Sequence, residues 1–214
     1  MYTPLDFATQ TEAFRRFQAA NPAPEGELEH SDAFTLLVAV VLSAQATDAG
    51  VNKATRGLFA RAATPAAMLA LGEAGLAEAI RTIGLYKQKA RNVIALCQIL
   101  LDRYAGQVPD SRAALQALPG VGRKTANVVL SIAFGHPAQA VDTHVFRVAN
   151  RTGLAPGRDV LAVERAIEDN VPVRYQRHAH HWLILHGRYI CTARKPRCGI
   201  CPIRDLCMFE EKTA

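Results

Sequence analysis

Residues 118–130 read LPGVGRKTANVVL, and this stretch predicts a helix, a tight hairpin and a second helix. Pro119 and Gly120 end the preceding segment, and Gly122 allows a backbone conformation that a side chain would resist. The second helix, expected from Arg123 onward, begins with unpaired backbone N–H groups and the positive end of the helix macrodipole. These features predict a cradle for a phosphate group.

Lys124 adds a chemical possibility to this hairpin. In the first turn of the expected helix, the macrodipole and the adjacent Arg123 both oppose a positive charge, which favours a nucleophilic amine. The other interpretation is a solvated lysine that contacts one more phosphate. On these residues alone, a DNA-binding module and a catalytic site are equally supported.

The composition indicates a folded protein with a polyanionic partner. The chain has 214 residues, of which 50% are hydrophobic, and a formal net charge of +6. That charge suits nucleic acid or an anionic membrane surface. The longest apolar run, at residues 33–42 and just beyond, is too short to span a bilayer, and the N-terminus lacks the pattern of a secretory signal. We therefore expect a cytoplasmic monomer with no membrane partner, nucleoid-associated if its source is bacterial.

Apolar periodicity and helix breakers predict an all-α fold. An apolar helix near residues 36–41 is apolar nearly all round, so we expect it at the centre of a core, with Ser31 as its N-cap. Two short helices are expected to start near Thr64 and Gly72. Further helices are predicted at residues 6–20, 48–59 (capped by Thr47), 87–103, 112–117, 123–134 and 159–170.

Two loops carry candidate DNA contacts. Residues 42–48, LSAQATD, mix small and polar side chains, which fits either a pocket wall or a solvated helix end. In the second loop, Gly84 breaks the helical pattern and leaves Leu85 at a loop tip beside Lys87 and Lys89. An apolar tip flanked by lysines suits a wedge in a base stack with ammonium groups on phosphates, although such a leucine is more often a core residue under its own loop.

Asp142 is the candidate partner of Lys124. The segment 135–142 can span about 26 Å when extended, which exceeds the roughly 18 Å length of the helix 123–134. The chain is therefore long enough to return Asp142 to Lys124. Asp142 also precedes an apolar helix and is a strong N-cap candidate. The two roles are compatible, because a cap uses one carboxylate oxygen.

Four cysteines near the C-terminus predict a metal site. Their spacing, C-x6-C-x2-C-x5-C, lets four thiolates converge, and the general rules for such ligands allow zinc or an iron–sulfur cluster, with zinc favoured. Cys97 lies in the apolar stripe of a helix and is expected to be an inert buried thiol. Residues 171–204 contain seven Arg or Lys residues and no Asp or Glu. The four candidate ligands are Cys191, Cys198, Cys201 and Cys207.

Together these motifs resemble the endonuclease III family of DNA glycosylases. The resemblance covers LPGVGRKTA, LSAQATD, IGLY at residues 83–86, VDTHVFRV at residues 141–148, and the cysteine pattern after HGRY. It implies that Lys124 attacks the sugar C1′ of a damaged nucleotide, that Asp142 is the second catalytic residue, and that the cysteines hold a [4Fe-4S] cluster. It also implies that Gln45 fills the gap left by the flipped nucleotide and that Leu85 is the wedge. The other implied contacts are Ser43, Asp48 and His144 in the lesion pocket, and Gly120, Val121, Gly122, Arg123, Lys195 and Arg197 on DNA.

The same resemblance implies an architecture and an activity. We expect an all-α protein in which two helical domains flank a DNA-binding groove: residues 25–136, with the helix-hairpin-helix at about 112–131, and an iron–sulfur domain of residues 1–24 and 137–214. The expected enzyme removes oxidised pyrimidines such as thymine glycol from double-stranded DNA and cleaves the abasic strand by β-elimination. The alternatives are a monofunctional relative acting on mismatched thymine or adenine, and a non-catalytic helix-hairpin-helix module. Lys124 argues against an adenine glycosylase, which lacks a lysine there.

Overall fold

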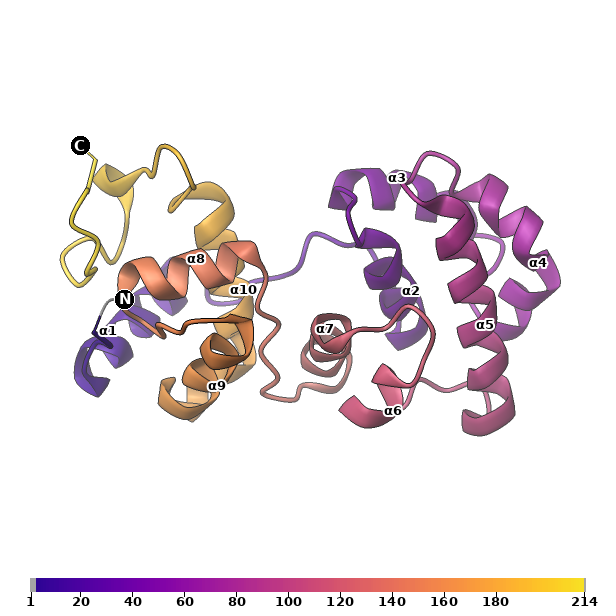
Figure 1. Ribbon diagram of the computed structural model, residues 1–214, viewed down its shortest axis with the longest axis horizontal. Helices are drawn as coiled ribbons and strands as arrows, with labels where there is room; N and C mark the ends of the chain where they lie inside the picture. Colours follow the sequence, from indigo (N-terminus) through magenta and orange to yellow (C-terminus); the bar gives the residue numbers. More distant parts are fainter. Residues whose placement is uncertain (1–2, 214) are drawn as a thin grey trace. The chain divides into compact units, whose positions relative to one another are not determined.

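The computed structural model describes residues 3–213, and it contains helices but no β-strand among those residues (Figure 1). The prediction of an all-α fold is confirmed. The chain forms two compact units. We call Glu27–Gly135 the central unit, and Met1–Gly26 with His136–Ala214 the terminal unit.

The central unit is built around one buried helix. In α2 (Ala33–Ser43), every residue from Phe34 to Leu42 is buried, which confirms the expectation of a central apolar helix. This helix packs against α3, α5 and α7, and α4 packs along α5 (Figure 1). The other helices of the unit are α3 (Asp48–Phe59), α4 (Pro65–Ala79), α5 (Tyr86–Tyr104), α6 (Arg112–Gln116) and α7 (Arg123–Phe134).

The N-terminus of α2 corrects one prediction. Its cap is Asp32 and not Ser31: the Asp32 Oδ1 accepts a hydrogen bond from the Thr35 backbone N–H at 2.8 Å, and the Thr35 Oγ1 accepts one from the Asp32 N–H at 3.0 Å. Two adjacent residues could each have capped the helix, and the one with extended backbone next to the first turn does so. The predicted cap Thr47 does start α3. The two predicted short helices join into α4, which kinks at Gly72 with φ 71°.

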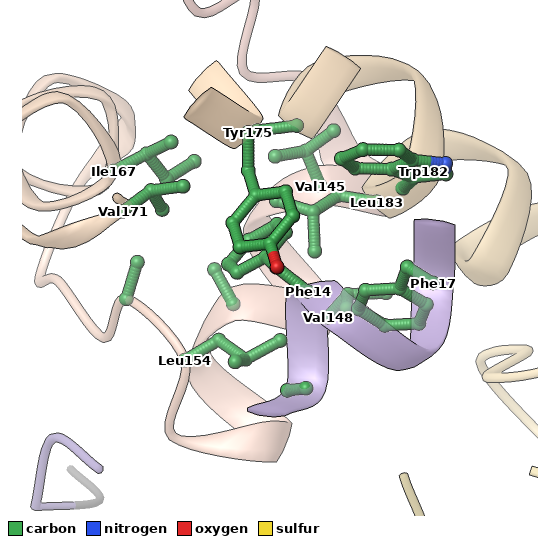
Figure 2. Packing of buried hydrophobic residues seen from close by; sticks show 14 of the residues in the cluster. Phe14, Phe17, Val145, Val148, Leu154, Ile167, Val171, Tyr175, Trp182 and Leu183 are labelled. Carbon is green, nitrogen blue, oxygen red and sulfur yellow. The ribbon is translucent and has the colours of Figure 1, made fainter. Parts of the chain in front are cut away.

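The terminal unit joins the two ends of the chain. It consists of α1 (Phe7–Ala20), α8 (Thr143–Thr152), α9 (Val160–Asn170), α10 (Val173–Tyr189) and the short 3₁₀ helix η1 (Cys198–Ile200). In its core, the Phe14 ring lies 6.0 Å from the Tyr175 ring and 6.3 Å from Trp182 (Figure 2). The Trp182 indole N–H donates to the Asn21 carbonyl at 2.8 Å. Aromatic packing and this hydrogen bond thus attach the N-terminal helix to α10.

No helix within residues 3–213 has both the length and the apolar character needed to cross a bilayer.

Candidate active site and cluster site

The hairpin before α7 is closed by one tight turn. The Val121 backbone N–H donates to the Leu118 carbonyl at 3.1 Å, and both side chains are buried. Gly120 has φ 79°, whereas Gly122 has φ −87°, which any residue adopts. The prediction that Gly122 supplies the special backbone conformation is therefore wrong, because the turn places that demand on Gly120.

We expect Gly120→Ala to lower the free energy of unfolding by about 2 kcal/mol. A Cβ there would adopt a left-handed backbone conformation and lie 3.0 Å from the Asn92 Nδ2 and 3.3 Å from the Val41 Cγ1. Thermal unfolding should show a fall in Tm of about 4–8 °C. Gly122→Ala is the matched control, since its Cβ would meet nothing within 4 Å; an equal loss in both variants would contradict the assignment.

The N-terminus of α7 presents backbone N–H groups without helical partners, together with positive charge. Its N-cap is Gly122, so within the described residues no side chain caps this helix, and its first turn holds no acid. Arg123 and Lys124 are its first two residues, and both are exposed. The macrodipole, the backbone N–H groups that lack partners within the helix, and the two cations together favour a bound anion.

The absence of a cap separates α7 and α5 from their neighbours. Among the described helices of the central unit, α2, α3, α4 and α6 each donate a backbone N–H to an N-cap side chain, and α5 and α7 do not. Both uncapped helices follow loops that the sequence assigns to DNA. Val121 is a partial exception among the predicted contacts: its side chain is 6% exposed, so only its backbone can face a ligand.

Gln45 and Leu85 share an unusual backbone conformation. They have φ 57° and 59°, and the third non-glycine residue with positive φ in the described chain is Ala105, which ends α5. Such conformations cost of order 1–3 kcal/mol and concentrate at functional sites. The Leu85 side chain is 63% exposed, so the interpretation of Leu85 as a core residue is wrong, and Gln45 is exposed as well.

The structure corrects the role of Lys89. Its side chain is 5% exposed, and its ammonium donates to the Leu42 carbonyl at 2.9 Å, so Lys89 does not contact phosphate as the sequence suggested. Burial lowers the pKa of this ammonium. Lys87, by contrast, is exposed in the first turn of α5 and keeps the predicted position beside Leu85.

The two other pocket candidates of the central unit flank Gln45. The Ser43 hydroxyl, in the last turn of α2, donates to the Val40 carbonyl at 2.9 Å. Asp48 begins α3 and is half-buried. Residues 43–48 therefore form a short connection between α2 and α3, with Gln45 at its exposed turn.

Asp142 is held as a helix cap in the terminal unit. Its Oδ1 accepts hydrogen bonds from the backbone N–H groups of His144 and Val145, both at 2.9 Å, which confirms the predicted cap of α8. Its Oδ2 accepts no hydrogen bond from the described residues and is left for another donor. His144 lies on the first turn of α8, with its Nδ1 3.3 Å from an Arg147 guanidinium nitrogen.

The four C-terminal cysteines line one cavity. Cys191, Cys198, Cys201 and Cys207 share it with the cations Arg151, Arg204 and Lys212. Within the described residues, no three His, Cys, Asp or Glu side chains converge closely enough for a single ion. Four sulfur ligands suit either a single zinc ion, with each sulfur about 2.3 Å from it, or an iron–sulfur cluster. Because four thiolates carry negative charge, the cationic lining fits such a cluster too.

Burial raises the pKa of two of these thiols, Cys201 and Cys207. It raises the pKa of Cys201 to about 11, and the neighbouring cysteines add to that effect. A bound metal centre would reverse this, since it binds the deprotonated thiolate. Cys97, outside this group, is fully buried in α5, and burial raises its pKa to about 12, as expected for an inert thiol.

Two arginines on α8 anchor the cysteine loop, and the sequence analysis missed them. Arg147 donates to the Cys191 carbonyl at 3.1 Å and to the Gly187 carbonyl at 2.7 Å. Arg151 donates to the Thr192 and Ala193 carbonyls and lies 3.8 Å from the Cys191 Sγ. The sequence feature that could have identified them is their spacing of four residues, which places both arginines on one face of a helix.

The loop between the first two cysteines is shaped by its own backbone. The Thr192 hydroxyl donates to the Lys195 carbonyl at 2.6 Å, and the Arg197 N–H donates to the Ile190 carbonyl at 2.8 Å. Lys195 and Arg197 are exposed, as their predicted role on phosphates requires.

Comparison with known proteins assigns a family to most of the sequence. Residues 38–173 match the model of the HhH-GPD superfamily of base excision DNA repair proteins, and residues 191–207 match the iron–sulfur binding domain of endonuclease III. The second match confirms the prediction of an iron–sulfur cluster, and the preference for zinc from general ligand rules is wrong. That the four cysteines are its ligands stays a prediction. Endonuclease III of Escherichia coli (strain K12) is 58% identical over 208 residues, which cover 97% of this chain and 99% of that protein.

Solved structures show the same fold. A trapped endonuclease III–DNA covalent intermediate, an estranged-adenine complex, superposes with a TM-score of 0.87 at 47% identity, covering 95% of this chain and 96% of that one. A thermostable thymine-DNA glycosylase gives a TM-score of 0.84 at 27% identity, covering 97% of each chain. The fold is thus shared with a glycosylase that acts on thymine, while the higher identity lies with endonuclease III.

Proposed function

The chain belongs to the endonuclease III family of the HhH-GPD superfamily, and from this membership we propose that Lys124 and Asp142 carry out its chemistry. The enzyme is a bifunctional DNA glycosylase and abasic-site lyase of base excision repair. The observation that carries the assignment of Lys124 is its place at the uncapped, cationic start of α7, where it is exposed beside a phosphate-binding turn.

In the proposed reaction the base is first flipped out of the duplex. The neutral Lys124 amine forms a bond to C1′ while the bond from C1′ to the base breaks and the base leaves with the electron pair. Asp142 accepts the proton lost by the amine, directly or through water, and its charge opposes positive charge on the sugar. The Asp142 Oδ2, which accepts no hydrogen bond from the described residues, supports this role.

Strand cleavage follows from the covalent intermediate. Once the sugar ring opens, the nitrogen of Lys124 is part of a Schiff base, which acidifies the C2′ proton. Loss of that proton drives the electron pair toward C3′, and the bond from C3′ to the 3′ phosphate oxygen breaks. The enzyme is then released by hydrolysis of the Schiff base. This sequence requires one nucleophilic amine and one proton acceptor, and the two motifs supply one each.

The remaining motif residues would hold the duplex. The backbone of residues 120–122 and the Arg123 side chain would bind phosphates at the hairpin, and Lys195 and Arg197 would do so at the cysteine loop. Gln45 would fill the space of the flipped nucleotide, and Leu85 would enter the base stack. The exposure of Lys195, Arg197, Gln45 and Leu85 supports these roles, as does the left-handed backbone conformation of Gln45 and Leu85. Ser43, Asp48 and His144 are the proposed walls of the lesion pocket.

We assign the two units separate tasks. The central unit carries the hairpin, the wedge and the proposed nucleophile, and the terminal unit carries the proposed acid–base residue and the cluster. The [4Fe-4S] cluster, held by the four cysteines, stabilises the loop of residues 191–207 and supplies no step of base excision.

A nicking assay on duplex DNA with a single thymine glycol tests this function. We expect base release and strand cleavage from one enzyme preparation, because the same intermediate leads to both. Base release without cleavage would identify a monofunctional glycosylase. Binding without base release would leave a non-catalytic helix-hairpin-helix protein, and either result would contradict the proposal.

A further inference from the structure

Lys89 donates hydrogen bonds to the last turn of α2 and to the residue that precedes α5, next to the two side chains that we propose to enter the duplex. Its backbone N–H donates to the Leu85 carbonyl at 3.0 Å, and its ammonium donates to the Leu42 carbonyl at 2.9 Å. Leu85 is the proposed wedge, and Leu42 lies three residues before Gln45, the proposed plug. One residue of α5 thus connects the end of α2, just before the Gln45 connection, to the carbonyl of Leu85.

The electrostatics of this bond favour a fixed geometry. Leu42 lies in the last turn of α2, where the carbonyls lack helical partners and the macrodipole is negative, so an ammonium there is stabilised. Lys89 takes part in no salt bridge within the described residues, and burial is the cause of its lowered pKa. An ammonium hidden from water needs its hydrogen bond, since a broken one would leave a buried charge without a partner.

The same two helices also support the hairpin. A Cβ on Gly120 would contact Asn92 of α5 and Val41 of α2, so the turn before Lys124 rests on the neighbouring parts of those helices. The Asn92 side chain is itself bonded, with its Oδ1 accepting from the Gln88 amide at 3.0 Å. A shift of α5 against α2 would therefore displace the plug, the wedge and the nucleophile relative to one another.

We propose that Lys89 is a positioning residue for base flipping, which sets the Gln45 loop and the Leu85 loop at one fixed separation. This inference rests on the proposed function, because it takes Gln45 and Leu85 as the plug and the wedge. Both are held in a left-handed conformation that a flexible loop would leave. Two side chains that enter one duplex bind best when their spacing is fixed before binding. If the two loops became ordered only on the DNA, the entropy cost of ordering them would reduce both affinity and rate.

The test compares Lys89→Met with Lys53→Met. Methionine keeps most of the buried stem of Lys89 but removes the ammonium, and Lys53 is an exposed lysine of α3 that lies outside the proposed site. Each variant is assayed on a thymine glycol in intact duplex and on an abasic site that faces a one-nucleotide gap. The second substrate has no base pair to open at the lesion. Its cleavage therefore needs the hairpin and the nucleophile, but not the insertion of Gln45 and Leu85.

In Lys89→Met we expect excision from intact duplex to fall on the order of 100-fold, while cleavage at the gapped abasic site stays near the wild-type rate. A 2-aminopurine opposite a non-cleavable abasic analogue should brighten less on binding the variant, because its base stays stacked. Lys53→Met should match the wild type in all three measurements.

The possible results distinguish a failure of this inference from a failure of the proposed function. Equal losses of activity on both substrates would show that Lys89 only stabilises the fold. No loss on either substrate would show that Lys89 has no part in base flipping. Each result would overturn the inference. If Lys89→Met fails to fold, Lys89→Arg, which keeps a donor at this position, is put through the same comparison. A wild-type enzyme inactive on both substrates would instead contradict the proposed function.

Discussion

Lys124→Gln is expected to yield no covalent adduct when borohydride is added to the enzyme and damaged duplex DNA. Glutamine has nearly the length of lysine but no nucleophilic amine, so no Schiff base forms for borohydride to reduce. Base excision should fall by about 10⁴-fold or more, as for other enzymes that lose their nucleophile. Single-turnover kinetics on a thymine-glycol duplex, with the adduct followed on denaturing gels, measures both effects.

The neighbouring residue provides the matched control for Lys124. Arg123→Gln removes one positive charge from the same exposed helix turn but leaves the amine in place. It should weaken DNA binding and reduce the salt dependence of binding by about one phosphate contact, and still give an adduct at saturating DNA. An adduct that persists in Lys124→Gln would assign the nucleophile to another residue of the chain.

Helix positions were predictable because breakers and caps mark them in the sequence. The predicted helix 123–134 matches α7 at both ends, since Gly122 precedes it and Gly135 follows it with φ 71°. The failures lie where two adjacent or nearby residues can serve equally well. Both Ser31 and Asp32 are good N-caps, and both Gly120 and Gly122 suit a turn. Tertiary packing makes the choice, as with Gly120, which faces Val41 and Asn92.

Lys89 was misassigned although its sequence context held the answer. Lys87 and Lys89 are two residues apart, so on a helix they point in nearly opposite directions, and only one can face DNA. Lys89 lies four residues before Val93, which belongs to the buried stripe of α5. The predicted helix 87–103 already contained both lysines, and α5 begins one residue earlier, at Tyr86.

The sequence predicted which residues form the candidate site, but it predicted only in part which metal they bind and what holds them in place. The spacing of four cysteines identified a metal site, but thiolate ligands suit zinc and iron–sulfur clusters alike, and the choice came from the family. The arginines of α8 that hold the loop donate to backbone carbonyls of residues forty and more positions away, a relation that no local pattern encodes. That Lys124 and Asp142 meet in one site stays a prediction, with one residue in each unit.

Asp142→Asn should lower the rate of base excision roughly 10³-fold while leaving the fold intact. Asparagine keeps the oxygen that accepts from the His144 and Val145 N–H groups, so the cap of α8 survives and the Tm should change little. What it loses is the negative charge and the capacity to take a proton. Single-turnover kinetics and thermal unfolding of the same preparation separate the two roles of this side chain.

Asp159→Asn is the matched control for Asp142, because Asp159 caps α9 of the same unit through the Ala162 N–H at 2.8 Å. The hydrogen bond from the Ala162 N–H lowers the pKa of Asp159, which keeps this carboxylate charged at neutral pH. Its replacement removes one negative charge from another helix cap of the terminal unit and should leave excision unchanged. If both variants behaved alike, Asp142 would be a helix cap and nothing more, and Lys124 would need a different acceptor for its proton. A loss confined to Asp142→Asn would instead tie catalysis to the second oxygen of that carboxylate, since the first is used by the helix in either case.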